Sequence, residues 1–190
     1  MTSRLMIIAA FGLIASAPAM AAQNLVINGG FETGDFSNWT LGSSNDLVYV
    51  DAYPQEGDYA ALFQNPTDSV VLNQTLTGLN ARGMYNVSFY LANDTAGDNN
   101  FDARFNGKSI FTAVNSAVQG YVRYTGMVQA STLGDIAIAF DGRNGPGTLY
   151  LDNVSVSAVP EATTWAMMIG GIGLVGAVMR RRSALPVVTA

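Results

Sequence analysis

Short runs of alternating hydrophobic and polar residues fill the chain between residues 23 and 157, and Gly, Asn and Asp interrupt them. In the clearest run, Met84–Leu91, every second residue from Tyr85 onward is large and apolar. A period of two is typical of a β-strand with one buried face. No stretch keeps a helical period for long. The strands predicted in this way are Leu25–Asn28, Leu47–Asp51, Ala60–Gln64, Val70–Thr77, Met84–Ala92, Phe101–Phe105, Ser109–Ala113, Tyr121–Gln129, Asp135–Asp141 and Leu149–Ser157.

The number and spacing of these strands indicate two packed sheets, because many short strands separated by turn residues are typical of a β-sandwich. The dipeptide Asn106-Gly107 stands between two of them. Asn and Gly both accept positive φ, so this dipeptide predicts a two-residue hairpin. The sequence therefore predicts one all-β domain over residues 22–158.

Residues 1–21 have the three parts of a secretory signal peptide. Arg4 provides a positive start, Leu5–Ala15 is apolar, and Ala19-Met20-Ala21 fits the small-x-small rule for cleavage. We expect transport by the general secretion machinery and cleavage by signal peptidase after Ala21, with Ala22 as the neighbouring option. The alternative is an uncleaved anchor helix, but the apolar run is short for a membrane span.

A second apolar segment lies near the other end of the chain, from Trp165 to Met179, and three arginines follow it. We expect a single transmembrane helix over residues 165–179, although fifteen helical residues reach only about 22 Å. The arginines favour the cytoplasmic side, which places the β domain outside. Residues 185–190 are expected to be a disordered tail.

This end of the chain resembles the PEP-CTERM sorting signal. Pro160 and Glu161 precede Trp165, the apolar segment and the arginine cluster, in the order of the PEPxxWA form. Ala162 stands where the family has a second proline. The resemblance covers about residues 159–184, and its basic cluster is Arg180, Arg181 and Arg182.

The resemblance implies recognition by an exosortase and cleavage near Pro160. It implies a protein that is exported through the inner membrane, held there before processing, and delivered to the cell surface or extracellular matrix. Such proteins come from Gram-negative bacteria that make exopolysaccharide. The alternative is a plain tail anchor that is not processed.

Composition excludes several classes of function. Between residues 23 and 159 there are five basic and thirteen acidic residues, a net charge of −8. So acidic a surface repels phosphate backbones, so we expect no nucleic-acid partner. The chain contains neither histidine nor cysteine, which excludes Ser-His-Asp and Cys-His nucleophiles and argues against a zinc site.

Three segments of the β domain resemble galactose-binding-like jelly rolls, the fold of several carbohydrate-binding modules. They are the opening Asn24–Trp39, the strand that begins at Gly57-Asp58-Tyr59, and the ending Gly147–Val156. The resemblance implies a jelly-roll β-sandwich, and it does not specify a ligand because this fold hosts many functions.

The family often holds a structural Ca²⁺ where the first and last strands meet. By motif position, Glu32 and Asp152 would supply carboxylates to such a site, and Asn28 and Asp58 could add oxygens. Hard cations of this kind need several oxygen ligands. The alternative is that the two carboxylates only accept hydrogen bonds from backbone N–H groups.

Sugar rings stack on aromatic faces, so exposed tyrosines are the candidates for a glycan site. The candidates are Tyr49, Tyr53, Tyr59 and Tyr124. Tyr121 is a further one, and it should face the opposite way from Tyr124 because the two are three positions apart, an odd number, on one strand. The alternative for each is packing within the sandwich, which we expect for Trp39.

The sequence thus predicts a non-catalytic surface or matrix protein that binds carbohydrate, with exopolysaccharide as the expected ligand, or that has a structural role. One alternative is an enzyme acting on that polymer, since glycoside hydrolysis needs only two carboxylates. Another is a self-associating adhesin that uses exposed sheet edges.

Overall fold

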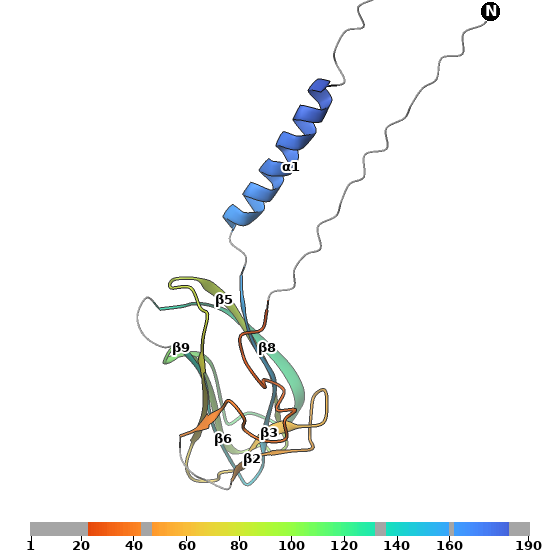
Figure 1. Cartoon of the computed structure of the whole chain (residues 1–190). Helices are drawn as coiled ribbons and strands as arrows, with labels where there is room; N and C mark the ends of the chain where they lie inside the picture. The colour runs from red at the N-terminus through yellow and green to blue at the C-terminus, as the bar shows by residue number, and fades with distance from the viewer. Residues whose placement is uncertain (1–22, 43–46, 132–135, 160–161, 183–190) are drawn as a thin grey trace, which may run out of the picture.

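A computed structural model of the chain describes residues 23–42, 47–131, 136–159 and 162–182. Within these residues, ten strands form two antiparallel five-stranded sheets that face each other, and one helix follows them (Figure 1). Sheet A has the order β2-β3-β10-β5-β8, and sheet B has the order β1-β4-β9-β6-β7. The strands are β1 Thr40–Leu41, β2 Val48–Asp51, β3 Ala60–Phe63, β4 Val70–Leu76, β5 Met84–Asn93, β6 Asp98–Phe105, β7 Lys108–Val114, β8 Gln119–Gln129, β9 Ile136–Gly145 and β10 Leu149–Ala158.

The core lies between the sheets and is rich in aromatic rings. Phe101 of β6 stacks on Phe140 of β9, with ring centroids 5.9 Å apart. Phe89 of β5 in sheet A reaches across to both rings, at 5.9 and 5.3 Å. Because alternate residues of these strands point inward, the period of two in the sequence becomes one continuous apolar layer.

The Asn106-Gly107 hairpin is confirmed. Asn106 has φ 51° and Gly107 has φ 74°, and the two residues join β6 to β7. Both central residues have positive φ, which matches the right-handed twist of the flanking strands.

The predicted strand Leu25–Asn28 is wrong. This segment makes only an isolated bridge, between Asn24 and Ser157 of β10. The backbone N–H and C=O of Ile27 are bonded instead to the side chain of Gln74, both at 2.8 Å. Asn28 then turns the chain with φ 53°. A side chain has taken the place of a neighbouring strand, which a periodic pattern does not reveal.

Strand β1 was not predicted, and it pairs with β4 through only two residues. The other nine predicted strands are present at their expected places, with ends that differ by a few residues. Asp135, the first residue of one of them, lies outside the described residues.

The C-terminal helix α1 spans Ala162–Arg182 and contains the segment for which a membrane span was expected. Within the described ranges, no helix combines the length and the apolar character needed to cross a membrane. The predicted signal peptide and the tail 185–190 lie outside the described residues.

Candidate functional site

The N-terminal segment lies against β10 and is joined to it by backbone hydrogen bonds. The N–H of Leu25 donates to the carbonyl of Val156, and the N–H of Val154 donates to the carbonyl of Gly29, both at 2.8 Å. A Cβ on Gly29 would lie 2.1 Å from the Val154 carbonyl oxygen. Only glycine allows the two backbone segments to approach this closely, and their approach brings the turn that follows Gly29 beside β10.

Two carboxylates next to this contact hold the loop that connects β2 to β3. Asp152 of β10 is fully buried, and its Oδ2 accepts hydrogen bonds from the N–H groups of Gln55 (2.7 Å) and Glu56 (3.3 Å). Glu32 accepts from the N–H groups of Asp58 (2.9 Å) and Tyr59 (3.2 Å). The carboxylates therefore replace the sheet partners that a loop backbone lacks.

Burial raises the pKa of Asp152, the charge of Glu32 raises it further, and the backbone hydrogen bonds oppose both effects. Among the described residues no lysine or arginine forms an ion pair with either carboxylate. Two neighbouring anions with no cation beside them are a donor set that a hard cation such as Ca²⁺ suits.

The predicted calcium ligands are brought together only in part. Glu32, Asp152 and the backbone of Asp58 meet, but Asn28 is used elsewhere. Its amide Nδ2 donates to Thr33 Oγ1 at 2.7 Å, and its own carbonyl accepts from the indole Nε1 of Trp39 at 3.0 Å. No group of three or more acidic, histidine or cysteine side chains suited to a metal occurs in the described part of the chain.

Three tyrosines surround a surface cavity of about 360 Å³ on the outer side of sheet A. Tyr53 comes from the β2–β3 loop, Tyr121 from β8 and Tyr150 from β10. The rings of Tyr53 and Tyr150 lie 5.4 Å apart at 40°. The hydroxyl of Tyr121 donates to the backbone carbonyl of Tyr53 at 2.6 Å. We call this feature the tyrosine cleft; Ala92, Asn93, Asp94, Val118, Gln119 and Gly120 also line it.

The ring of Tyr53 lines the solvent-facing side of the cleft, because this residue is 64% exposed. Most tyrosines in a folded domain turn the ring inward and leave only the hydroxyl in water. An exposed ring supported from behind by Tyr150 offers a flat apolar surface to a ligand.

Asp94 sets the polar side of the cleft. Its carboxylate accepts hydrogen bonds from the Thr148 N–H (2.7 Å) and the Tyr150 hydroxyl (2.9 Å). Burial alone would raise the pKa of Asp94, but these hydrogen bonds and one from Thr95 outweigh it and lower the pKa. Burial and the bond to Asp94 raise the pKa of Tyr150 to about 12. At neutral pH Asp94 is therefore charged, and Tyr150 is a neutral donor with a fixed ring.

The other tyrosine candidates lie outside the cleft. Tyr124 faces the core, where its ring stacks on Phe89 at 5.6 Å and contacts Phe111 at 4.2 Å. Tyr49 is half-buried on β2, opposite Leu62 in the register. Tyr59 is half-buried at the end of the β2–β3 loop and packs against the core.

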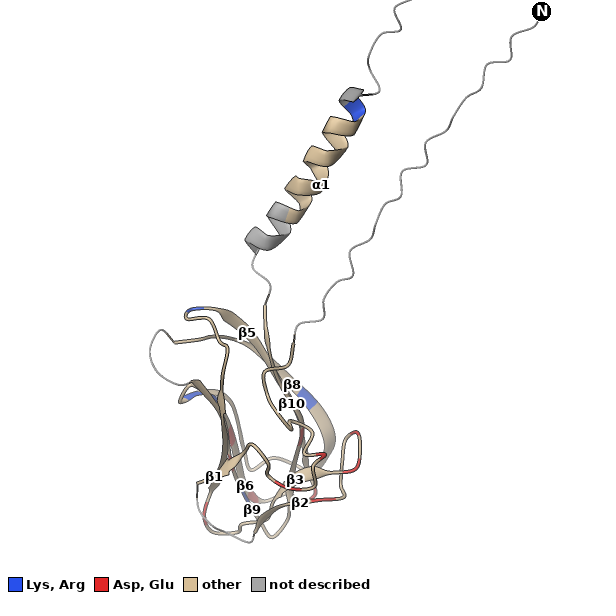
Figure 2. Cartoon of the chain, viewed as in Figure 1, with Lys and Arg blue, Asp and Glu red and all other residues tan. Residues whose placement is uncertain are grey.

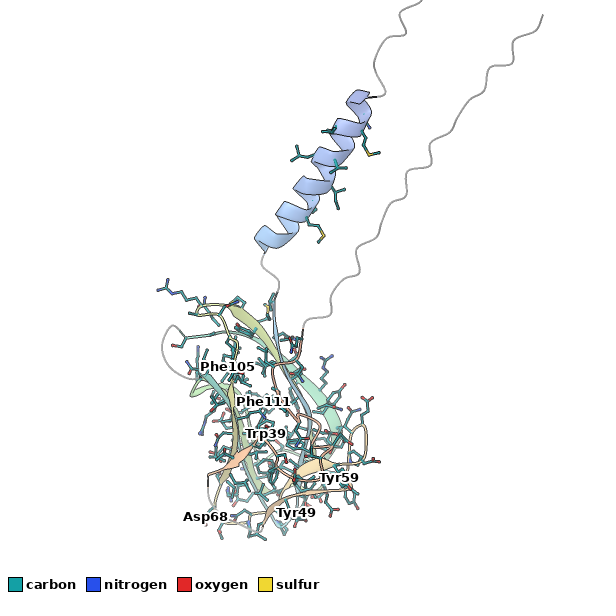
Figure 3. The ribbon with its side chains drawn as sticks, in the orientation of Figure 1. Trp39, Tyr49, Tyr59, Asp68, Phe105 and Phe111 are labelled. Carbon is teal, nitrogen blue, oxygen red and sulfur yellow. The ribbon has the colours of Figure 1, made fainter. Side chains whose placement is uncertain are left out.

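Figure 3 shows Tyr49 and Tyr59 at the loop end of the sandwich and Trp39 in its interior. Trp39 is buried, as expected, and packs on Phe31 at 5.5 Å. Sequence reasoning missed Tyr150. The signal available was its outward position between the inward residues Leu149 and Leu151, but nothing in the sequence placed it beside Tyr53.

The residues of the C-terminal motif follow the β domain. Trp165 and Arg180–Arg182 belong to α1, with the arginines at its last turn. Arg180 is exposed. Pro160 and Glu161 lie outside the described residues.

A family model described as the PEP-CTERM protein-sorting motif matches residues 158–182. The predicted sorting signal is thereby confirmed. Such a motif implies export, association with the cell surface, and processing by an exosortase and the export machinery. No curated protein sequence matches the chain.

The β domain is similar in fold to carbohydrate-binding modules. TmCBM61 in complex with β-1,4-galactotriose aligns with a TM-score of 0.57 at 21% identity, over 73% of this chain and 100% of its own. The CBM22-1 xylan-binding domain from Paenibacillus barcinonensis Xyn10C aligns with a TM-score of 0.55 at 17% identity, over 76% of this chain and 99% of its own. The enzymatically active domain of bacteriophage CBA120 tailspike protein 4 aligns with a TM-score of 0.55 at 18% identity, over 72% of this chain and 21% of its own. At these identities the likeness shows the fold, a jelly-roll β-sandwich, and confirms the predicted fold class.

Proposed function

We propose that this protein is an exported, non-catalytic carbohydrate-binding protein that holds a glycan chain in the tyrosine cleft. The observation that carries the proposal is the exposed ring of Tyr53 beside Tyr121 and Tyr150 at an open cavity. The faces of pyranose rings are apolar and stack on aromatic rings, while their hydroxyls hydrogen-bond to polar groups at the edge. The cleft supplies both kinds of surface, with Asp94 and Gln119 at its polar side.

The arrangement of acids supports a binding role over hydrolysis. Glycoside hydrolysis usually needs two carboxylates that flank the scissile bond. Asp94 is the one carboxylate among the described residues that line the cleft. Its carboxylate already accepts hydrogen bonds from Thr148 and Tyr150. Its lowered pKa suits neither a general acid nor a proton shuttle at neutral pH. The carbohydrate-binding modules of similar fold favour the same conclusion.

The sorting motif suggests where the glycan is met. After export, we propose, an exosortase cleaves near Pro160-Glu161 and leaves the β domain at the cell surface or in the matrix. The ligand in that setting is exopolysaccharide.

We propose further that Glu32 and Asp152 hold a structural Ca²⁺. The support is the buried, unpaired charge of Asp152 beside Glu32. The ion would neutralise the pair and fix the β2–β3 loop from which Tyr53 projects. Its role would be stability, because binding to the folded state alone raises the free energy of unfolding.

The test of glycan binding is retention of the full chain on immobilised β-1,4-galactan and xylan, the polymer classes named for two similar structures. Tyr53→Ala should weaken binding roughly tenfold, because a stacked aromatic ring contributes about 1 kcal/mol or more. Tyr53→Phe keeps the ring and should bind like the natural chain. Ile27→Ala, an exposed apolar change outside both the cleft and β8, is the matched control.

Equal retention of the natural chain and Tyr53→Ala would remove the cleft as the binding site. Release of reducing sugar that Asp94→Asn abolishes would instead identify a glycoside hydrolase.

A further inference from the structure

The last strand of sheet A, β8, ends the sheet with an open edge. It is eleven residues long and pairs on one side with β5, and no described strand lies on its other side. In an antiparallel strand about half of the backbone N–H and C=O groups point to each side. One row of these groups along β8 is therefore available to another strand.

The other edges of the two sheets are shorter. β1 has two residues and β2 has four, so neither offers a long row of partners. β7 has seven residues and begins with Lys108, a charged residue of the kind that discourages edge pairing. β8 has no proline, one charged residue, Arg123, and two exposed apolar side chains, Val122 at 42% and Met127 at 71%. None of the usual means of blocking an edge is strongly developed on it.

Charge also singles out this side of the domain. Residues 103–134 contain no Asp or Glu, although thirteen acids lie between residues 23 and 159. The acid-free stretch includes both β7 and β8. Figure 2 shows basic residues on β8 and acidic ones in the loops beside β2 and β3. Two copies of so acidic a domain repel each other least when they meet through this stretch.

Next to the β8 edge the sandwich is open. A cavity of about 470 Å³ lies between β7 and β8, lined by Phe105, Lys108, Ile110, Gly126, Met127 and Gln129 among others. A Cβ built on Gly126 would meet nothing within 4 Å. Glycine is thus not required there by crowding, and it leaves the backbone of the edge accessible in the middle of the strand.

We propose that β8 pairs antiparallel with β8 of a second copy of this chain, across a two-fold axis perpendicular to sheet A. The pairing joins two five-stranded sheets into one continuous sheet. A two-fold axis makes the pair antiparallel automatically and matches two edges of equal length. The recognition chemistry is the unpaired backbone, the exposed Met127 and Val122, and the absence of acids on both edges. The interface uses the backbone edge of β8, whereas the cleft uses the side chain of Tyr121 on the same strand, and this proposal does not rest on glycan binding.

Cysteine cross-linking tests the proposal sharply because the natural chain has no cysteine. In an antiparallel pair, opposed residues have Cα atoms about 4.5–5.5 Å apart, which is within the reach of a disulfide. A residue on the two-fold axis meets its own copy, and its neighbours meet different residues. Single-cysteine variants of the full chain are made at Val122, Arg123, Thr125, Gly126 and Met127.

The variants are oxidised alone and in mixtures of two, and dimers are counted on non-reducing gels. We expect one position, which then lies on the two-fold axis, to give at least about tenfold more dimer than the others, because a shift of two residues exceeds disulfide reach. If the axis passes through Tyr124, two mixtures should give that excess instead: Val122→Cys with Gly126→Cys, and Arg123→Cys with Thr125→Cys. Ile27→Cys, exposed at 59% and away from β8, is the control. Met127→Lys should weaken association measured by sedimentation at least about tenfold, since lysine is a common edge-blocking residue.

The proposal is overturned if the natural chain stays monomeric at high concentration and no β8 cysteine exceeds the Ile27→Cys control. Oligomers whose cross-linking does not depend on position along β8 also overturn it, because they indicate association through the apolar chain ends. Loss of glycan retention with intact β8 cross-links contradicts the function proposed for the cleft and leaves this interface standing.

Discussion

The phenolic oxygen of Tyr121 lies 2.6 Å from the carbonyl oxygen of Tyr53 and donates a hydrogen bond to it. This bond ties the β2–β3 loop to β8, residues that are 68 positions apart in the chain. Burial, followed by the charge of Asp152, raises the pKa of Tyr121, so the hydroxyl is a donor at neutral pH. The bond holds the exposed ring of Tyr53 at the cleft.

Tyr121→Phe should therefore weaken glycan binding while it keeps the fold. The change removes one hydrogen bond, which contributes about 1 kcal/mol, and leaves the ring in place. We expect glycan affinity to fall a few-fold, with most of the effect on the dissociation rate, as measured by surface plasmon resonance on xylan or galactan. Tyr49→Phe is the control, because Tyr49 lies outside the cleft. Equal losses in the two variants would show that the Tyr121 hydroxyl does not position the loop.

Asp152 predicts an unusual dependence of stability on pH. Its folded-state pKa is raised by burial, by more than the backbone hydrogen bonds lower it. The charged form therefore costs stability above the folded pKa, and that cost disappears as the pH falls through it. In chelator, the contribution of Asp152 should make the chain more stable as the pH falls through the folded pKa toward the ordinary aspartate value of 3.8. Thermal melts at a series of pH values measure this.

Bound Ca²⁺ should reverse the sign of that contribution, because the ion stabilises the charged carboxylates and protons compete with it. Added calcium should raise the melting temperature at pH 7 and do so less at low pH. Asp152→Asn should abolish the calcium response, while Asp68→Asn, a change at an exposed acid elsewhere, should keep it. Melting curves that ignore both calcium and chelator would contradict a calcium site.

Gly29 should tolerate no side chain. A Cβ there would lie 2.1 Å from the Val154 carbonyl oxygen, so Gly29→Ala must displace the N-terminal segment from β10. We expect a loss of roughly 1–3 kcal/mol in the free energy of unfolding, the usual cost of overpacking. Gly126→Ala is the control, since its Cβ meets nothing within 4 Å. Chemical denaturation compares the two, and similar stabilities would contradict the close approach.

The sorting motif predicts two separate defects in cells. Replacing Pro160-Glu161 with Ala-Ala should leave a full-length C-terminus on the exported chain, because exosortase processing is expected at that site. Replacing Arg180–Arg182 with glutamine should slow processing without moving the cleavage site, because the arginines belong to the motif matched over residues 158–182. Intact mass spectrometry of the surface fraction reports both cleavage sites. Normal processing of the Ala-Ala variant would rule out cleavage at this motif.

Local patterns were sufficient for much of the fold. Nine strands could be placed from alternation alone, and Asn106-Gly107 marked its hairpin, because the period of a strand and the φ values of a turn depend on neighbouring residues. Alternation wrongly predicted a strand over Leu25–Asn28. Within this segment Ile27 is bonded to the Gln74 side chain, and a contact between residues 47 positions apart leaves no periodic trace.

The sequence by itself determined the sorting motif and the β-rich body, and it marked the motif carboxylates Glu32 and Asp152, because each is written in adjacent residues or in a short spacing. Only the tertiary structure decided that Tyr53, Tyr121 and Tyr150 share one cleft with Asp94, that Tyr124 belongs to the core, and that β8 ends a sheet. Those outcomes depend on which strands become neighbours and in what register. Strand pairing is set by the joint burial of the whole core, and no single stretch of sequence specifies it.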